Sequence, residues 1–215
     1  MHAQIMPEST LKALEMARQT GNFQWYVIPL FAFVVYVYSV EIERRNWNLV
    51  LAGLTVWGLD WNLEVINSLF LHFSKFSAVW TEVGPTAFQI LVGLNIETSF
   101  MFAIMGIAYG KMLPADKTMK ILGINNRIFY IVTNAIFCVF IEVLLNKMGY
   151  LVWNYEWWNF PNVYLIIIFG YSLYFIFSYY VIDAKEMKTK LMVTGSIWGL
   201  FALQVIIFGS LGMLK

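Results

Sequence analysis

Acidic residues inside apolar stretches are the first feature of this 215-residue sequence that could do chemistry. Four carboxylic acids lie well inside long apolar segments, namely Asp60, Glu64, Glu97 and Glu142. No lysine or arginine lies deep in these segments. An acidic residue at the centre of a membrane helix costs roughly 2.5–3.5 kcal/mol on insertion scales, so such residues usually have a function. An acid that stays neutral in a dry cavity can donate a proton, and we expect all four to be catalytic.

The spacing of these acids places them on polar helix faces. One stripe, spaced by three and four residues, consists of Trp57, Asp60, Glu64 and Asn67. A second stripe, spaced by four residues, consists of Asn134, Cys138, Glu142 and Asn146. Residues at these intervals share one side of a helix, which should face the protein interior. The simpler alternative is that the acids and asparagines only hydrogen-bond neighbouring helices together.

Aromatic residues near the acids indicate the walls of a substrate pocket. Aromatic faces stabilise cations by roughly 0.5–2 kcal/mol. Acids beside aromatic rings could therefore protonate an apolar substrate and shelter the resulting carbocation. We expect the substrate to contact Trp57, Trp61, Asn67, Asn134, Tyr171 and Tyr174. The alternative is that these side chains only fill the space between helices.

The composition excludes several classes of protein. Sixty per cent of the residues are hydrophobic, 18% are aromatic and 13% are charged, whereas soluble domains contain about 25% charged residues. The net charge of +1 provides no basic surface for a nucleic acid. One cysteine and two histidines allow neither a disulfide framework nor a histidine-rich metal site. We expect a membrane protein without metal or cofactor.

Six apolar segments are long enough to cross a hydrocarbon core of about 30 Å. They lie near residues 25–40, 48–72, 85–110, 128–147, 162–182 and 191–213. The predicted fold is an all-α, polytopic membrane helical bundle of about six transmembrane helices. We expect residues 1–24 to form an N-terminal interfacial segment and residues 25–215 to form a single transmembrane domain.

The distribution of basic residues predicts the orientation. Nine of the 14 lysines and arginines lie in the first, third and fifth loops, which are on one side of a six-helix bundle. Cytoplasmic loops carry the excess of basic residues. Both termini are therefore predicted to be non-cytoplasmic, unless the N-terminal segment contains a seventh span.

Two parts of the sequence resemble each other. The first copy contains Glu64, Trp80, Glu82, Pro85 and Gly93, and the second contains Glu142, Trp153, Glu156, Pro161 and Gly170. We interpret them as helical hairpins of the same direction, related by a pseudo-twofold axis normal to the membrane. This relation would place Glu64 and Glu142 at matching depths. Chance similarity between apolar helices is the alternative. The aromatic loop 149–158 is either a lid over the pocket or an ordinary interfacial loop.

Two motifs resemble known families. The run from Asp60 to Asn67, followed by Gly93-Leu94-Asn95-Ile96-Glu97, is similar to the second and third helices of small integral-membrane terpene cyclases that make meroterpenoids. The resemblance implies an acid role for Glu64. The order Glu142, Gly149, Trp153, Tyr155, Pro161 is similar to integral-membrane lycopene cyclase domains. The meroterpenoid cyclases have seven spans and an acid in the last one. Here the last apolar segment contains none, so Asp60, Glu97 or Glu142 would supply the second acid.

These features predict an integral-membrane enzyme of isoprenoid biosynthesis. The predicted reaction is a proton-initiated cyclisation or isomerisation of a lipophilic isoprenoid substrate by buried carboxylic acids. The expected partners are this substrate and membrane lipid, with no nucleic acid, and an oligomer is possible. A proton-coupled transporter or channel is the first alternative. A non-catalytic subunit of a membrane complex is the second.

Overall fold

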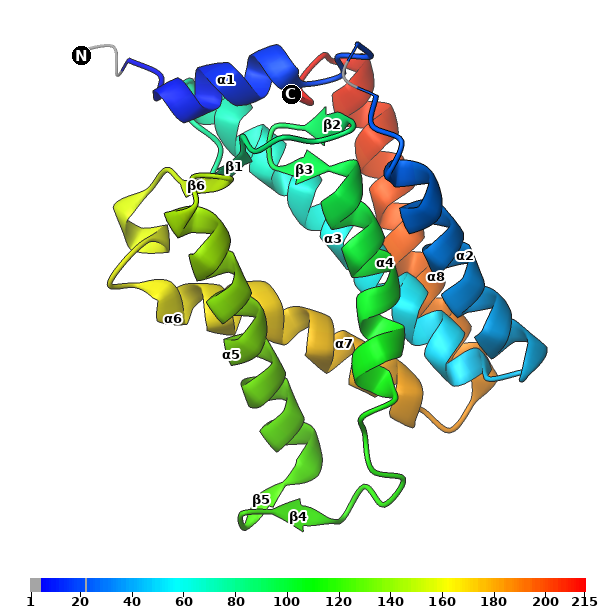
Figure 1. The fold of residues 1–215 in the computed structure, drawn as a ribbon. Coiled ribbons are helices and arrows are strands. Elements are labelled where there is room, and N and C mark those ends of the chain that lie inside the picture. Colours follow the sequence, from blue (N-terminus) through cyan, green and yellow to red (C-terminus); the bar gives the residue numbers. More distant parts are fainter. Residues whose placement is uncertain (1–4, 22) are drawn as a thin grey trace.

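A computed structural model describes residues 5–21 and 23–215 of the chain and is mostly helical (Figure 1). Six helical rods lie in this described part. They are α2 (Val27–Glu43), α3 (Trp47–Ser74), α4 (Ile96–Gly110), α5 (Asn126–Lys147), the continuous α6 (Val163–Leu165), η2 (Ile166–Tyr171) and α7 (Ser172–Asp183), and finally α8 (Met187–Gln204) with η3 (Val205–Gly209). The predicted all-α membrane helical bundle is confirmed.

Four of these rods are long and apolar enough to cross a membrane, by length and composition. They are Trp47–Ser74, Asn126–Lys147, Val163–Asp183 and Met187–Gly209. The other two rods are shorter, with 17 residues in α2 and 15 in α4. Both segments η2 and η3 are π-helical turns within their rods. Turns of this kind often occur at functional sites.

The third predicted transmembrane segment, residues 85–110, is wrong in its first part. Residues 85–95 contain no helix, and instead β2 (Gln89–Leu91) pairs with β3 (Leu94–Asn95) in a hairpin. The Asn95 side chain accepts a 2.8 Å hydrogen bond from the backbone N–H of Thr98. Asparagine is a strong N-cap, so the helix begins at Ile96 although the preceding residues are apolar. This shift matters because it moves Glu97 from mid-span to the first turn of α4.

Helix α3 lies at the centre of the bundle and packs against α4, α7 and α8. Small residues allow α3 and α4 to touch through their backbones, because a methyl group on Gly106 would collide with the carbonyl of Ala52. On the other side, Trp198 Nε1 of α8 donates a 2.9 Å hydrogen bond to the Leu54 carbonyl of α3. These contacts make α3 a fixed scaffold for the side chains that it carries.

A two-stranded ribbon joins the two halves of the predicted repeat. Strand β1 (Trp80–Glu82) follows α3, strand β6 (Leu151–Trp153) follows α5, and the two pair antiparallel with Trp80 opposite Trp153. In the sequence comparison these tryptophans are the matching residues. An antiparallel pair with matching residues opposite each other has a local twofold axis between them, as the predicted repeat requires at this point.

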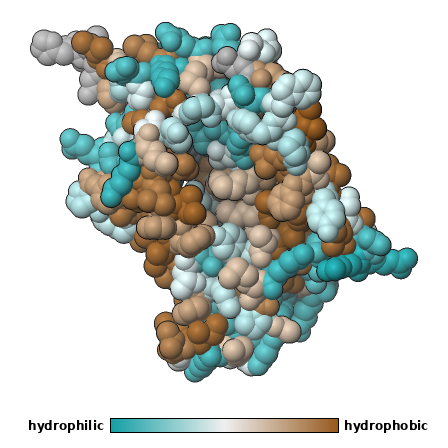
Figure 2. Space-filling model, viewed as in Figure 1, coloured by the Kyte–Doolittle hydropathy of each residue, from teal (hydrophilic) through white to brown (hydrophobic). Residues whose placement is uncertain are grey.

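The two ends of the bundle differ. The short helix α1 (Glu8–Met16) lies across one end, beside β1, and the C-terminus is at the same end (Figure 1). The opposite end carries the hairpin of β4 (Lys120–Ile121) and β5 (Ile124–Asn125). The short turn η1 (Glu156–Trp158) is not part of that end and comes directly after β6 in the chain. On the face shown in Figure 2, apolar surface predominates across the middle, the α1 end is more hydrophilic, and the opposite end mixes hydrophilic and apolar side chains.

Candidate functional site

A cavity of about 260 Å³ lies between α3, α4, α5 and the α6–α7 rod. Four carboxylic acids line it. Asp60 and Glu64 come from α3, Glu142 comes from α5 and Glu82 comes from β1. Of the described residues that line this cavity, none is a lysine, arginine or histidine. The structure thus brings together three of the four acids that the sequence predicted, Asp60, Glu64 and Glu142, whose catalytic role stays a prediction.

The acids of α3 are deeply buried and incompletely hydrogen-bonded. The exposed fraction is 2% for Asp60 and 4% for Glu64. Glu64 Oε1 accepts a 2.8 Å hydrogen bond from Trp80 Nε1. Asp60 Oδ2, Glu64 Oε2 and Glu142 Oε2 are buried and accept no hydrogen bond from any described residue. A buried polar atom without a partner is costly, so these oxygens are candidates for contact with a ligand.

Glu82 is a member of the site that the sequence analysis missed. Its carboxylate accepts hydrogen bonds from Thr98 Oγ1, at 2.7 Å, and from the backbone N–H of Asn95, at 2.8 Å. Burial raises the pKa of the Glu82 carboxyl to about 7, although these two hydrogen bonds act in the opposite direction. The group can therefore exchange a proton near neutral pH. The Trp-x-Glu motif of the first repeat pointed to it, but its position in a loop gave no reason to expect burial.

Glu97 lies outside the cavity, contrary to the prediction. It accepts a 2.8 Å hydrogen bond from the backbone N–H of Ala87 and a 2.5 Å bond from Thr86 Oγ1, and it also accepts one from the Tyr26 hydroxyl. The reason is the late start of α4, which places Glu97 at the end of the bundle. There it connects the segment before α2 to the loop before α4.

Four predicted substrate contacts also lie outside the cavity. Trp57 Nε1 donates a 2.9 Å hydrogen bond to Ser99, and the Trp61 ring packs on Phe201. The Asn134 side chain donates to the Tyr179 hydroxyl at 2.7 Å. These side chains lie between helices, as the alternative of core packing proposed.

Asn67, the fourth of these residues, anchors β1 instead of contacting the cavity. Its Oδ1 accepts a 2.8 Å hydrogen bond from the Val79 N–H, and its Nδ2 donates to the Trp80 carbonyl at 2.9 Å. Asn67 therefore holds Trp80 where its ring nitrogen reaches Glu64. On the polar face of α3, Asp60 and Glu64 therefore line the cavity, whereas Asn67 holds the loop that contains β1.

Gly93 allows the β2–β3 hairpin to approach these side chains. A methyl group on Gly93 would lie 2.7 Å from Glu64 Oε2 and 2.8 Å from Trp80 Nε1. Real side-chain carbons do not approach other atoms so closely. The absence of a side chain at this position lets the hairpin close the cavity above Glu64.

Tyr171 and Tyr174 line the cavity as predicted, although their contact with a substrate stays a prediction. Tyr171 ends the π-helical turn η2, and the Phe102 ring of α4 lies 6.2 Å from it and 4.9 Å from Tyr174 between ring centroids. These rings form an aromatic wall beside the acids. Such a wall can stabilise a positive charge in an apolar space.

The aromatic loop 149–158 covers one end of the cavity. Leu151 and Trp158 of this loop are among the lining residues. The Trp158 ring stacks on Trp80 with 6.2 Å between centroids. Loops from both halves of the molecule therefore close the cavity at the end where α1 lies.

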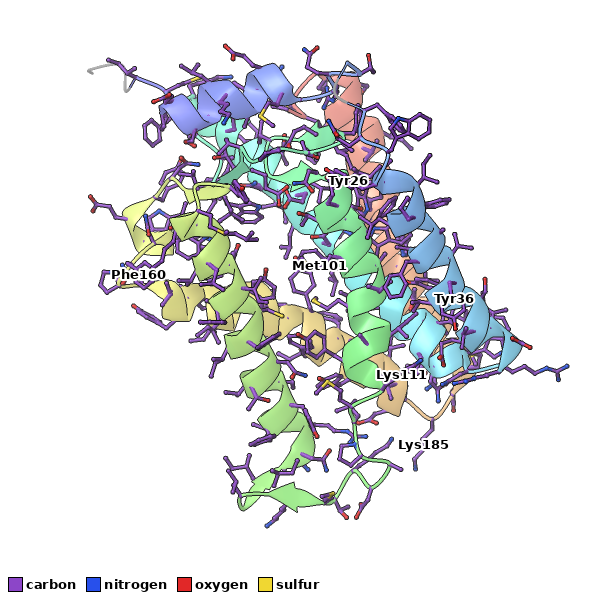
Figure 3. All side chains as sticks on the ribbon, in the orientation of Figure 1. Tyr26, Tyr36, Met101, Lys111, Phe160 and Lys185 are labelled. Carbon is purple, nitrogen blue, oxygen red and sulfur yellow. The ribbon has the colours of Figure 1, made fainter. Side chains whose placement is uncertain are left out.

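The cavity reaches the lipid-facing surface between α4 and α5. Met101, Phe137 and Ile141 line the cavity and are nevertheless 44%, 53% and 37% exposed. Met101 lies on the side of α4 that faces α5 (Figure 3). The surface here is apolar and hollowed (Figure 2). These three side chains define what we call the lateral opening.

The arrangement of the described acidic side chains does not match a metal site. Within residues 5–21 and 23–215, no group of three or more histidine, cysteine, aspartate and glutamate side chains is arranged to hold a metal. The acids instead surround an apolar volume, in which they can hold, donate and accept protons.

Comparison with known proteins places this chain among membrane proteins. A model of a family described as an uncharacterized membrane protein family matches residues 7–210. The chain belongs to this membrane protein family. A family relative from Archaeoglobus fulgidus, described as an uncharacterized protein, is 45% identical over 200 residues, which are 93% of this chain and 95% of the relative. No solved structure matches the chain. Neither description mentions a terpene cyclase, so that resemblance stays a prediction.

Proposed function

We propose that this protein is an integral-membrane enzyme that protonates a lipophilic isoprenoid substrate and so starts its cyclisation or isomerisation. One observation carries the proposal: unpartnered oxygens of Asp60 and Glu64 lie in a largely apolar, aromatic cavity that opens toward lipid. A substrate dissolved in the bilayer can reach such acids without crossing water. An aqueous substrate would have no comparable route through the lateral opening.

The hydrogen bonds suggest different roles for the two acids on α3. Asp60 Oδ2 accepts no hydrogen bond from the described residues, whereas Glu64 Oε1 accepts one from Trp80. Because a hydrogen-bond donor stabilises an ionised carboxylate, we assign proton donation to Asp60 and proton acceptance to Glu64. Glu82 and Glu142 line the same cavity and would return the proton to Asp60.

In the proposed reaction the substrate gains one proton from the enzyme and later returns one to it. Asp60 transfers its proton to a carbon of a substrate double bond, so that a C–H bond forms, the π bond breaks and a carbocation results. A second double bond then attacks this cation and closes a ring, or a hydrogen shifts. Loss of a proton to Glu64 ends the reaction. Tyr171, Tyr174 and Phe102 would stabilise the cation by roughly 0.5–2 kcal/mol per ring.

The basic loops favour one orientation of this enzyme in the membrane. The β4–β5 end of the bundle would face the cytoplasm, because the loops rich in lysine and arginine lie there. Both termini and the loop that covers the cavity would then be non-cytoplasmic. Reaction of single-cysteine variants with a membrane-impermeant thiol reagent tests this orientation, after replacement of Cys138.

The function is tested with purified protein in liposomes and a set of isoprenoid alkenes, alcohols and epoxides. Mass spectrometry detects cyclised or isomerised products, and D₂O as solvent labels the carbon that receives the proton. We expect Asp60→Asn and Glu64→Gln to abolish turnover, while Glu97→Gln outside the cavity retains it. Turnover that is unchanged in both cavity variants would refute the assignment.

One observation favours a proton-coupled transporter as a second candidate. The Trp80–Trp153 pair joins the two segments that resemble each other in sequence, and many transporters are built from repeats. Proton flux measured in liposomes, with and without small organic cations, separates the two functions. Flux that depends on Asp60 without any chemical product would favour the transporter.

A further inference from the structure

We infer that the ligand of this cavity is an uncharged lipid whose reactive end lies beside the acids while its tail passes between α4 and α5 into the bilayer. The inference rests on the proposed function and names its substrate class. It specifies three properties of the ligand: the route of entry, the charge of its head and the position of its tail.

The route of entry follows from which sides of the cavity are closed. The β1–β6 ribbon and the Trp80–Trp158 stack cover the end near α1. Helix α3 packs directly on α4 and α7 along the back of the cavity. Helix α5 packs mainly on η2 and α7. The lateral opening of Met101, Phe137 and Ile141 is therefore the side through which a lipid can enter.

The charge of the head follows from the lining residues. Four carboxylic acids line the cavity, and the described lining residues contain no cationic side chain. Proteins bind phosphate esters through arginine, lysine or helix N-termini. A phosphate or diphosphate beside Asp60 and Glu64 would face four carboxylic acids, and the hydroxyl groups of Thr98 and the tyrosines could not neutralise its charge. A hydroxyl, an epoxide or an alkene can instead accept a proton or hydrogen bond from these acids.

The position of the tail follows from the size of the cavity. Pockets that enclose a drug-sized ligand measure roughly 300–1,000 Å³, and this cavity measures about 260 Å³. It holds the reactive end of a long lipid but not the whole chain. The remaining tail must lie in the lateral opening, where exposed apolar side chains already line the path.

Photolabelling tests the inference without requiring turnover. The probe is a long-chain isoprenoid alcohol with a diazirine near its tail end, added to the protein in lipid nanodiscs. Excess unlabelled alcohol distinguishes saturable labelling from general contact with lipid. We expect saturable labelling of residues at the lateral opening. Saturable labelling confined to α2 or α8 would overturn the proposed path.

The second measurement is binding affinity. It compares two variants of the protein with each other, and the alcohol with its phosphate ester. Phe137 and Phe140 lie on the same helix and are 53% and 55% exposed, but only Phe137 lines the cavity. We expect Phe137→Trp to weaken saturable binding of the alcohol about tenfold, while Phe140→Trp leaves it unchanged. The monophosphate ester of the same alcohol should bind the unmodified protein at least about tenfold more weakly.

The outcomes separate this inference from the proposed function. Equal binding by the two tryptophan variants, or binding of the monophosphate as tight as that of the alcohol, would overturn the inference even if products form. Conversely, saturable alcohol binding with the expected pattern but without any product would support the ligand class and refute the enzyme.

Discussion

Trp80 and Glu64 are joined by a 2.8 Å hydrogen bond from the indole Nε1 to the carboxyl Oε1, and this bond connects the loop after α3 to the middle of the site. The bond serves both the fold and the chemistry. It closes the cavity, since Trp80 also stacks on Trp158, and it fixes the direction of the Glu64 carboxyl group.

Replacement of Trp80 with phenylalanine should retain the apolar packing and remove the hydrogen bond. Glu64 would then be buried without a donor from Trp80, which costs about 1–3 kcal/mol. We expect a lower free energy of unfolding in detergent and a marked loss of turnover in liposomes. Trp25→Phe is the control, because the Trp25 side chain is exposed outside the cavity. Equal behaviour of the two variants would show that the bond is unimportant.

Gly93→Ala should disturb the same pair from the opposite side. The added methyl group would lie 2.7 Å from Glu64 Oε2 and 2.8 Å from Trp80 Nε1, so the hairpin or both side chains must move. Overpacking of this kind typically costs about 1–3 kcal/mol. Gly195→Ala is the control, because its methyl group would meet no atom within 4 Å. Thermal unfolding of both variants measures the difference, and a Gly93→Ala protein as stable as the control contradicts the packing.

The Glu82 carboxyl should make stability depend on pH. Its pKa is raised from 4.5 to about 7 in the folded protein. Between these values the folded state binds more protons than the unfolded state. The contribution of Glu82 to stability is therefore fully present below about pH 4.5 and is lost as the pH rises through about 7. Unfolding at a series of pH values measures this slope.

Glu82→Gln should reduce that slope, because glutamine does not titrate. Turnover of the unmodified protein should also fall as the pH rises through about 7, since the protonated form of Glu82 then disappears. Asp60, Glu64 and Glu142 face the same cavity and remain in the variant. A slope that is the same with and without Glu82 would assign the titration to those other groups.

Asp183→Asn should loosen the opposite end of the bundle. Arg127 Nε and Nη2 donate hydrogen bonds of 2.9 and 2.8 Å to the two oxygens of Asp183, which joins the start of α5 to the end of α7. Both side chains are partly exposed, so we expect a loss of only about 1–2 kcal/mol. Hydrogen exchange of the backbone amides should increase there while the cavity keeps its protection. Unchanged exchange at residues 126–130 would contradict this role.

The sequence determined the class of protein and most of its helices. Long apolar segments without enough polar residues can only be stable in a bilayer, and helices satisfy their own backbone hydrogen bonds there. For the same reason, acids inside such segments had to face other protein atoms. This argument correctly brought Asp60, Glu64 and Glu142 to one cavity.

Only the tertiary structure decided which other residues join these acids. Hydropathy could not show that residues 85–95 form a hairpin, because short apolar strands and helices look alike in sequence. Because this hairpin precedes α4, the helix begins only at Ile96 and Glu97 lies outside the site. The burial of Glu82 depends on the β1–β6 ribbon, which pairs strands about 70 residues apart. Helix periodicity identifies a polar face but not its neighbour, so Trp57, Asn67 and Asn134 shared that pattern without reaching the cavity. Trp61, next to Asp60 in the sequence, packs on Phe201 instead.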